Sequence, residues 1–187
     1  MTARPEDGAV VGLDPSLRSA GIAEIRHPAT IHPPNRPKAV SVGNRGKSDA
    51  TVAQRAARIH AQARNILAET PKDARLVVIE ALPPQIPGAH GLHAERAALW
   101  WQVVGTLIRH GIPVAEVAPT TLKKWATGDG RADKHAVVAA MQQRWTFTRI
   151  PDDNAADALA LADMGAQHLG WYGPEAEHHH SPNVRWP

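Results

Sequence analysis

The stretch AVVGLDPSLRSAGIAEIR, residues 9–26, decides the fold, because it contains two strand patterns separated by a short turn. Residues 9–14 are an apolar run that ends in Asp14, and residues 20–26 are a second apolar run. The Pro-Ser link between them predicts a hairpin. A buried strand that ends in a carboxylate is unusual, since burying an unpaired charge is costly. Asp14 is therefore either a solvated turn residue or a residue with a cationic partner.

The rest of the chain alternates between strand and helix patterns. Further strands are predicted at 39–43, 74–80 and 112–119, and helices from a Ser48 or Asp49 N-cap to Pro71, over 92–110 with Gly111 as the C′ residue, at 120–126, at 134–145 and from 151 onward. The strand at 74–80, the following helix and the next strand form a βαβ unit, which implies a parallel pair. The whole order predicts an α/β fold, a mixed sheet with helices on both faces.

Length and composition limit the class of protein. The chain has 187 residues, 43% of them hydrophobic, a net charge of +3 and no cysteine. These values fit one ordinary domain, permit a polyanionic partner and exclude disulfides and thiolate metal sites. Neither a secretory signal nor an apolar stretch of membrane-spanning length is visible, so we expect a cytoplasmic protein without membrane contact. The expected organisation is a disordered N-terminus (1–8), one domain (9–169) and an irregular tail (170–187).

Acidic residues recur where a site is expected. The strand at 74–80 ends in Glu80, just as the first strand ends in Asp14. If the two strands are neighbours, both carboxylates project from the carboxyl-end edge of the sheet, where sites usually lie. The last helix adds Asp153, Asn154 and Asp157, whose spacing of three and four residues allows each pair to share a face.

The chemistry of this set favours a hard metal ion. Oxygen ligands without His or Cys suit Mg²⁺ or Mn²⁺, and two such ions would activate water and stabilise the leaving oxygen of a phosphodiester. Simpler explanations exist for single members. Asp152 or Asp153 at a helix start is most simply an N-cap, and Asp14 alone is a turn residue about as often as not. These simpler explanations do not account well for the occurrence of all three acidic segments in one chain.

Four segments together resemble the RuvC family of Holliday-junction resolvases, within the RNase H-like superfamily. They are GLDPSLRSAGIAEI, LVVIE, PTTLKKWATGDGRADK and PDDNAADALALA, in the family's order and spacing over about residues 9–169. The resemblance implies an RNase H-like five-stranded mixed sheet in the order βββαβαβα. It also implies that Asp14, Glu80 and Asp157 bind metal. The family's fourth acidic position falls on Asn154, so the fourth ligand is either Asn154 or Asp153, and we favour Asp153.

The resemblance extends to DNA contacts and assembly. Lys123 and Lys134 match lysines that meet the DNA backbone near the cut, although a lone Lys123-Lys124 pair is more simply a solvated helix face. Arg18 and Lys124 complete the predicted DNA-binding set. The helix at 92–110 matches the one that forms the family's homodimer, and it carries Trp100-Trp101. One of two adjacent helical residues normally faces the core, so only one of these indoles is expected at an interface.

The predicted function is a Mg²⁺-dependent endonuclease, with Mn²⁺ able to substitute and two ions per site, that resolves four-way DNA junctions in recombination and repair. The host would be a bacterium or a phage-infected cell. One alternative is another RNase H-like nuclease, acting on flaps, forks or RNA–DNA hybrids. A second is a non-catalytic junction-binding protein, which the Asn154 departure suggests. A third, the core of a transposase or guided nuclease, fits poorly with the chain length.

Overall fold

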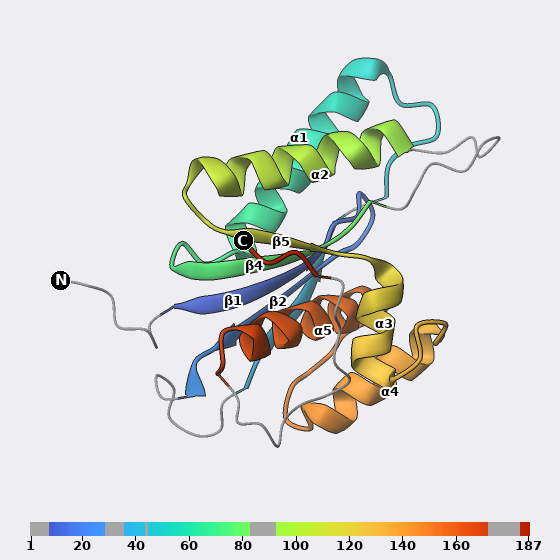
Figure 1. Ribbon diagram of the computed structural model, residues 1–187. Helices are drawn as coiled ribbons and strands as arrows, with labels where there is room; N and C mark the ends of the chain where they lie inside the picture. Colours follow the sequence, from blue (N-terminus) through green and yellow to red (C-terminus); the bar gives the residue numbers. More distant parts are fainter. Residues whose placement is uncertain (1–7, 29–35, 44, 83–92, 172–183) are drawn as a thin grey trace.

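A computed structural model describes residues 8–28, 36–43, 45–82, 93–171 and 184–187 (Figure 1). Its elements are β1 (Ala9–Asp14), β2 (Ala20–Arg26), β3 (Lys38–Val42), α1 (Val52–Glu69), β4 (Ala74–Glu80), α2 (His93–Arg109), β5 (Val114–Val117), α3 (Pro119–Thr127), α4 (Lys134–Arg144) and α5 (Asp153–His168). The predicted α/β fold and the predicted strands are confirmed. Nearly all of the predicted 82–91 loop lies outside the described residues.

The five strands form one mixed sheet in the order β3-β2-β1-β4-β5. β1 pairs antiparallel with β2, as the predicted hairpin requires, and β2 pairs antiparallel with β3. β1 pairs parallel with β4, and β4 pairs parallel with β5, which confirms the βαβ prediction. The carboxyl ends of β1, β4 and β5 therefore meet at one edge of the sheet.

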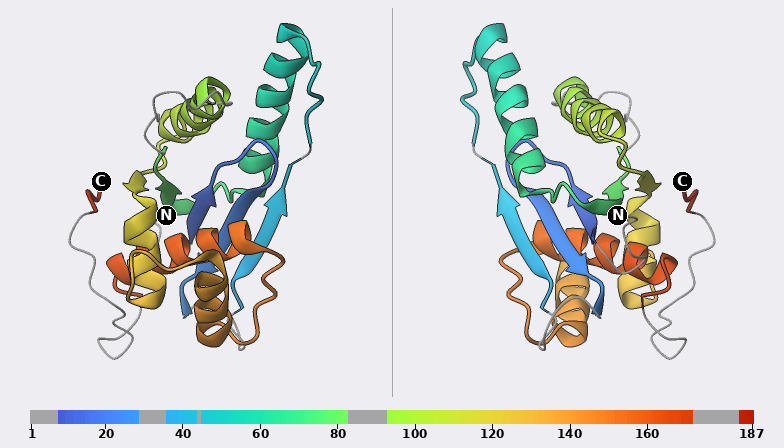
Figure 2. Two further views of the ribbon diagram at one scale, coloured as in Figure 1. Left: turned by 90° about the vertical axis from the view of Figure 1, so that its right-hand side faces the viewer. Right: turned by 90° about the vertical axis from the view of Figure 1, so that its left-hand side faces the viewer.

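Helices cover both faces of this sheet (Figure 2). α1 and α2 lie on one face, and α3, α4 and α5 lie on the other. Alternate residues of β1 follow this division: Val10 joins the cluster under α5, whereas Val11 and Leu13 join the cluster under α1 and α2. The sheet thus lies between two hydrophobic cores, and the residues at its carboxyl-end edge lie between these cores as well.

α5 approaches the sheet unusually closely, because small residues face each other across the contact. A Cβ atom added at Gly12 would lie 1.9 Å from the carbonyl oxygen of Ala158, and one added at Gly21 would lie 1.9 Å from that of Asn154. On the helix side, a Cβ atom at Gly165 would lie 2.7 Å from side-chain carbons of both β1 and β4. Only glycine fits at these points, so the sequence sets the depth at which α5 sits.

The start of α1 differs from the prediction. Thr51, rather than Ser48 or Asp49, is the N-cap, and the helix begins at Val52. Thr51 and Gln54 form a capping box, in which each side chain accepts a hydrogen bond from the backbone N–H of the other residue. This reciprocal arrangement satisfies two backbone donors at once, whereas a cap at Ser48 or Asp49 has no Gln or Glu three residues later.

The end of α2 follows the prediction. Gly111 has a φ of 72° and donates its N–H to the Ile108 carbonyl, while Ile112 donates to the Leu107 carbonyl. This pair of bonds is a Schellman motif, in which glycine adopts the left-handed conformation without strain. It turns the chain directly from α2 into β5.

The described ends of the predicted tail contact the domain. Trp171 is buried in the α5-side core, and Trp186 stacks on His168 with ring centroids 4.0 Å apart. Arg185 forms an isolated antiparallel bridge with Glu116 of β5. The predicted N-terminal segment and most of the tail lie outside the described residues. Among the helices that the structure describes, none has the length and apolarity needed to cross a membrane.

We expect Gly12→Ala to lower the free energy of unfolding by about 2 kcal/mol or more, because a methyl group at this position must push α5 away from β1. Gly105→Ala in α2 is the matched control. No atom lies within 4 Å of a Cβ built there, and alanine is the better helix former, so stability should stay level or rise. Urea unfolding measures both. An unchanged midpoint for Gly12→Ala would contradict the close-approach model.

Candidate active site

Asp14 and Glu80 lie side by side at the carboxyl-end edge of the sheet. In the parallel β1–β4 ladder Leu13 is the register partner of Ile79, so the next residues, Asp14 and Glu80, follow on adjacent strands. Both side chains are partly buried. The adjacency that the two strand-terminal carboxylates predicted is therefore present.

Burial raises the pKa of the Asp14 carboxyl well above its usual value, and a hydrogen bond with Glu80 and the nearby Glu80 charge raise it further. Burial also raises the pKa of Glu80, whereas its hydrogen bond with Asp14 lowers it. The two carboxyls therefore interact strongly, and burial raises the pKa of both. Two partly buried carboxyls without a bound cation share a proton because ionising both is unfavourable.

α5 brings a third carboxyl to the pair. Its close contact with β2 places the Asn154 backbone over Gly21, which is the register partner of Asp14. One turn further along, Asp157 is partly buried. Burial, followed by the charge of Asp14, raises the pKa of Asp157 to about 7. Three carboxyls from β1, β4 and α5 thus lie within electrostatic reach of one another.

The two residues that compete for the fourth position behave differently. Asp153 forms an ion pair with Lys134, and this bond lowers the pKa of Asp153 and raises that of Lys134. Asn154 is partly buried at the contact between α5 and β2. Asp153 also acts on Asp14 and Asp157 electrostatically, so it belongs to the same acidic group. Its role as fourth ligand stays a prediction.

Asp152 is the N-cap of α5, as the simpler explanation expected. Its side chain accepts a hydrogen bond from the Ala155 N–H at 2.9 Å. It also accepts from the hydroxyl of Ser41 in β3 at 2.6 Å and from that of Ser19 at 3.4 Å. One carboxylate therefore caps the helix and ties its N-terminus to the hairpin side of the sheet.

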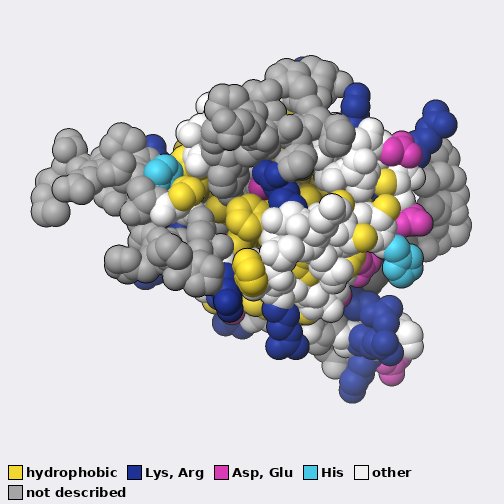
Figure 3. Space-filling view, turned by 90° about the horizontal axis from the view of Figure 1, so that it is seen from below, with side chains coloured by type: hydrophobic (Ala, Val, Ile, Leu, Met, Phe, Trp, Pro, Cys, Tyr) yellow, Lys and Arg dark blue, Asp and Glu magenta, His cyan; other side chains and the backbone are white. Residues whose placement is uncertain are grey.

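Two predicted lysines lie near the carboxyls. The charge of Lys134 lowers the pKa of Asp14, Glu80 and Asp157, and that of Lys123 lowers the pKa of Glu80 and Asp157. Both cations lie on the α3–α4 side of the sheet edge. Seen from that side, Lys and Arg side chains form their largest visible group near one edge of the face (Figure 3).

The remaining predicted DNA contacts lie further out. Lys124 is exposed on α3, beside the partly buried Lys123. Arg18 is exposed in the turn between β1 and β2 and lines a different, basic groove. The structure therefore brings Lys123 and Lys134 within electrostatic reach of the acidic group, whereas Lys124 lies on the exposed side of α3 and Arg18 lies in the basic groove.

Side chains that sequence reasoning did not single out hold the turn behind Asp14. Gln62 of α1 is 2% exposed, and its amide nitrogen donates to the carbonyls of Ser16 and Val42 at 2.8 Å each. The guanidinium of Arg58 donates to the Leu17 carbonyl at 3.1 Å. In the sequence, the role of Gln62 is indicated only by a polar residue among apolar helix positions. Its partners, Ser16 and Val42, lie far away along the chain.

Glu80 is held through its backbone. The indole N–H of Trp100 in α2 donates to the Glu80 carbonyl at 2.8 Å. Trp100 is 6% exposed, whereas its neighbour Trp101 is 63% exposed. The expectation that only one of the two indoles faces outward is thus confirmed.

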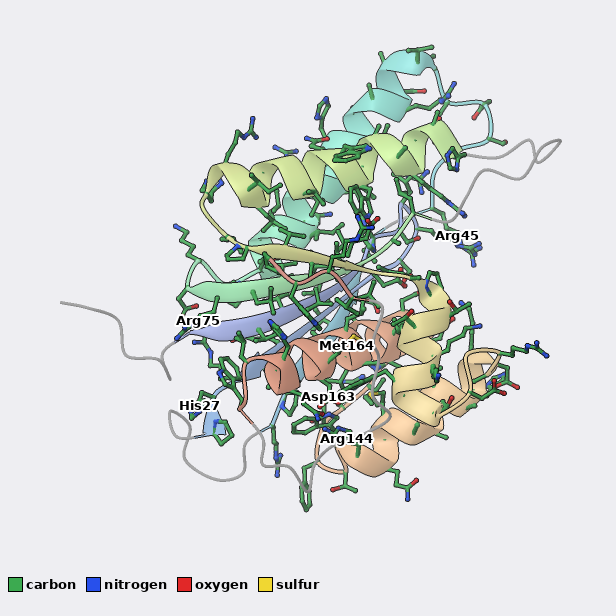
Figure 4. All side chains as sticks on the ribbon, viewed as in Figure 1. His27, Arg45, Arg75, Arg144, Asp163 and Met164 are labelled. Atoms are coloured by element: carbon green, nitrogen blue, oxygen red, sulfur yellow. The ribbon has the colours of Figure 1, made fainter. Side chains whose placement is uncertain are left out.

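A buried charged cluster lies beneath α5. Asp163 is fully buried, forms an ion pair with Arg144 at 2.8 Å and accepts a hydrogen bond from the Trp125 indole at 3.1 Å (Figure 4). The three residues join α3, α4 and α5, so they fix the helices that carry the lysines. The sequence showed Asp163 only as an acid within an alanine-rich run.

The acidic group has the chemistry of a metal site without the closed geometry of one. Every candidate ligand offers oxygen, and burial raises the pKa values of Asp14, Glu80 and Asp157, so a cation bound among them would favour their ionised forms. Among the residues that the structure describes, however, no group of three or more Asp, Glu, His or Cys side chains is arranged to hold a metal ion. The donor set fits a hard divalent cation, and the Asp14–Glu80 hydrogen bond would have to give way to coordination.

Comparisons with known proteins point in one direction. The family model described as "Crossover junction endodeoxyribonuclease RuvC" matches residues 10–164. A Gloeobacter violaceus protein of that name is 41% identical over 78 residues, which are 41% of this chain and only 39% of the relative. One from Bradyrhizobium diazoefficiens is 30% identical over 172 residues, 90% of this chain and 93% of the relative. A structure titled "T. thermophilus RuvC in complex with Holliday junction substrate" has a TM-score of 0.59 and 21% identity, covering 83% of this chain and 91% of that one.

We expect Asp14→Asn to raise the free energy of unfolding at pH 7 by about 1 kcal/mol or more in the absence of divalent ions, because it removes one of three crowded carboxyls. Thermal unfolding in a chelating buffer measures this change. Asp73→Asn is the control, because Asp73 forms an ion pair with Arg26 at 2.9 Å and its loss should not stabilise the protein. A decrease for Asp14→Asn would show that Asp14 has a net favourable partner.

Proposed function

Because this chain belongs to the RuvC family, we propose that it is a metal-dependent endonuclease that resolves four-way DNA junctions by hydrolysing phosphodiester bonds. The observation that carries the proposal is the meeting of Asp14, Glu80 and Asp157 at one edge of the sheet, with two lysines beside them. The family match, the shared name of the relatives and the RuvC-like fold support the same activity.

We assign the metal to the acidic group as part of this proposal. Asp14, Glu80 and Asp157 would hold a divalent cation, expected to be Mg²⁺ with Mn²⁺ as a substitute, and two ions would share the site. Asp153 is our preferred fourth ligand, with Asn154 as the alternative. When bound, the cation supplies positive charge that allows the carboxyls to ionise and that polarises the scissile phosphate.

The protein's own residues orient the substrate. Lys134 is exposed, and its bond with Asp153 raises the pKa of its amine further above neutral pH. Together with Lys123 it attracts the phosphate backbone that the carboxylates alone would repel. Trp100 and Gln62 act indirectly: Trp100 fixes the backbone at Glu80, and Gln62 fixes the turn that follows Asp14.

A homodimer through α2 completes the proposal, because two symmetric cuts need two sites. Trp101 and Ile108, seven residues apart on one face of α2, are 63% and 60% exposed. Large apolar side chains at this spacing form a stripe, and aromatic residues are enriched at protein interfaces. We infer that this stripe is covered by the second copy.

The function is tested with labelled DNA substrates and Mg²⁺. We expect faster cleavage of a four-way junction than of a fork, a flap or an RNA–DNA hybrid, and a loss of about a thousandfold or more in Asp14→Asn, since several kcal/mol of charge stabilisation depend on this site. Preference for the hybrid or the fork would support the alternative nuclease. Tight junction binding by the wild type without cleavage in Mg²⁺ or Mn²⁺ would support a non-catalytic binding protein.

Metal binding is tested separately from activity. We expect Mg²⁺ to raise the thermal unfolding midpoint of the wild type, with a stabilisation of about 2.7 kcal/mol at one hundred times the dissociation constant. Asp14→Asn should lose most of this effect, because one of the proposed metal ligands would be gone. Asp153→Asn and Asn154→Ala distinguish the fourth ligand: a weaker Mg²⁺ effect in Asp153→Asn alone supports Asp153. The reverse ranking would assign the position to Asn154.

A further inference from the structure

A basic groove lies beside the turn that follows Asp14, on the face of the sheet opposite α5. Its walls are the turn Ser16–Arg18, residues 45–48 and Ala50, the first half of α1 and the start of α2 around Arg96. It encloses about 980 Å³, and we call it the α1 groove. Figure 4 marks Arg45 in the segment that leads into α1.

The charge of the α1 groove is strongly one-sided. Six cationic side chains line it and one acid, whereas the whole chain carries a net charge of only +3. The cationic side chains are those of Arg18, Arg45, Lys47, Arg55, Arg58 and Arg96. The acid, Glu95, is buried and forms an ion pair with Arg55. The groove therefore concentrates positive charge far beyond the average of the surface.

Four of these cations form no ion pair with another residue in the part of the chain that the structure describes. Arg18, Arg45, Lys47 and Arg96 are exposed, and none of the ion pairs formed between described residues involves them. Arg58 differs, because its guanidinium is tied to the turn through the Leu17 carbonyl. Like charges gathered without partners weaken the fold, so their grouping indicates a polyanionic ligand.

The shape of the groove suits a long ligand rather than a small molecule. Arg18, Arg45, Lys47 and Arg96 come from three separate segments and are exposed rather than enclosed. The first turns of α1 project from the body of the protein, with Val52 77% exposed (Figure 2). Small residues between the cations, among them Ala57 and Ala61, leave the wall of α1 open to close approach. A polymer with regularly spaced charges fits this surface.

The groove is close to the carboxyls along the chain. Arg18 follows Asp14 by four residues, so the two lie within about 14 Å even in a fully extended chain. A DNA duplex rises 3.4 Å per base pair on each strand, so this span corresponds to about four base pairs. A duplex that enters the acidic site would thus reach the groove within its next few phosphates.

We propose that the α1 groove binds the sugar–phosphate backbone of a duplex arm that leads away from the cutting site. The identification of the ligand as DNA rests on the proposed function, whereas the binding of a polyanion does not. The groove would supply affinity and orientation and would take no part in the chemical step. Arg45, Lys47 and Arg96 would be backbone contacts without base specificity.

The test is binding of a fluorescent four-way junction without divalent ions, measured by anisotropy across a range of salt concentrations. Arg45→Gln with Arg96→Gln removes one cation from each of two walls. Each lost phosphate contact is worth about eightfold in affinity at 0.1 M salt, because about 0.9 counterions are released per contact. We expect the double variant to bind at least about tenfold more weakly, with a salt slope smaller by about 1.8.

A matched control is Lys72→Gln with Arg109→Gln. It removes the same charge from two exposed cations outside the groove, and Arg109 lies at the far end of α2, about 20 Å from Arg96. The control should bind within about twofold of the wild type, as expected for cations without phosphate contacts. Single-turnover cleavage at saturating protein should stay unchanged in the groove variant. Binding equal to that of the control, or a loss of cleavage rate at saturation, would overturn the proposal.

The two proposals can fail independently. A wild type that binds DNA through the groove but does not cut junctions would refute the nuclease function and leave the groove standing. Junction cleavage together with control-like binding by the groove variant would do the opposite. If inorganic phosphate binds in the groove but the groove variant binds DNA as tightly as the control, the groove is a site for a small anion. That result would refute a DNA contact.

Discussion

The contact between α5 and the sheet is the constraint on which the rest of the structure depends. Gly12 and Gly21 let the helix backbone approach β1 and β2, and the alanines of α5 keep its near face flat. Because this distance is short, Asp157 reaches the carboxyls at the ends of β1 and β4. A helix held one side-chain layer higher would leave Asp14 and Glu80 as a pair without the third carboxyl.

Two acidic residues of α5, Asp163 and Asp157, are fully or partly shielded from solvent, and their electrostatic surroundings are opposite. Asp163 is fully buried but has Arg144 and Trp125 as partners, so its charge is compensated within the fold. Asp157 lies among carboxyls and is compensated only in part, by lysines at some distance. The first arrangement holds three helices together. The second is left without a full partner and can be compensated by a bound cation, which is why we propose the acidic group, and not the Asp163 cluster, as the site of chemistry.

The sequence allowed much of this to be predicted, because the decisive signals were local or followed from a general rule. Asp14 and Glu80 each end an apolar run, and the parallel-strand rule makes such ends neighbours. Thr51 was missed as the N-cap although its capping box is local, because Ser48 and Asp49 also fit the pattern. Gln62 and Asp163 were not predictable, since their partners are far apart in the chain. The roles of Gly12 and Gly21 depend on how closely a helix packs, which no periodicity reports.

The paired indoles of α2 link the outer surface of the protein to its acidic edge. Trp101 faces outward, Trp100 lies against it with ring centroids 4.8 Å apart, and Trp100 holds the carbonyl of Glu80. Trp101 is therefore connected to the backbone of Glu80 through one ring contact and one hydrogen bond. In the dimer that we propose on that surface, the two acidic edges would be connected through these paired indoles, so the state of one edge could influence the other.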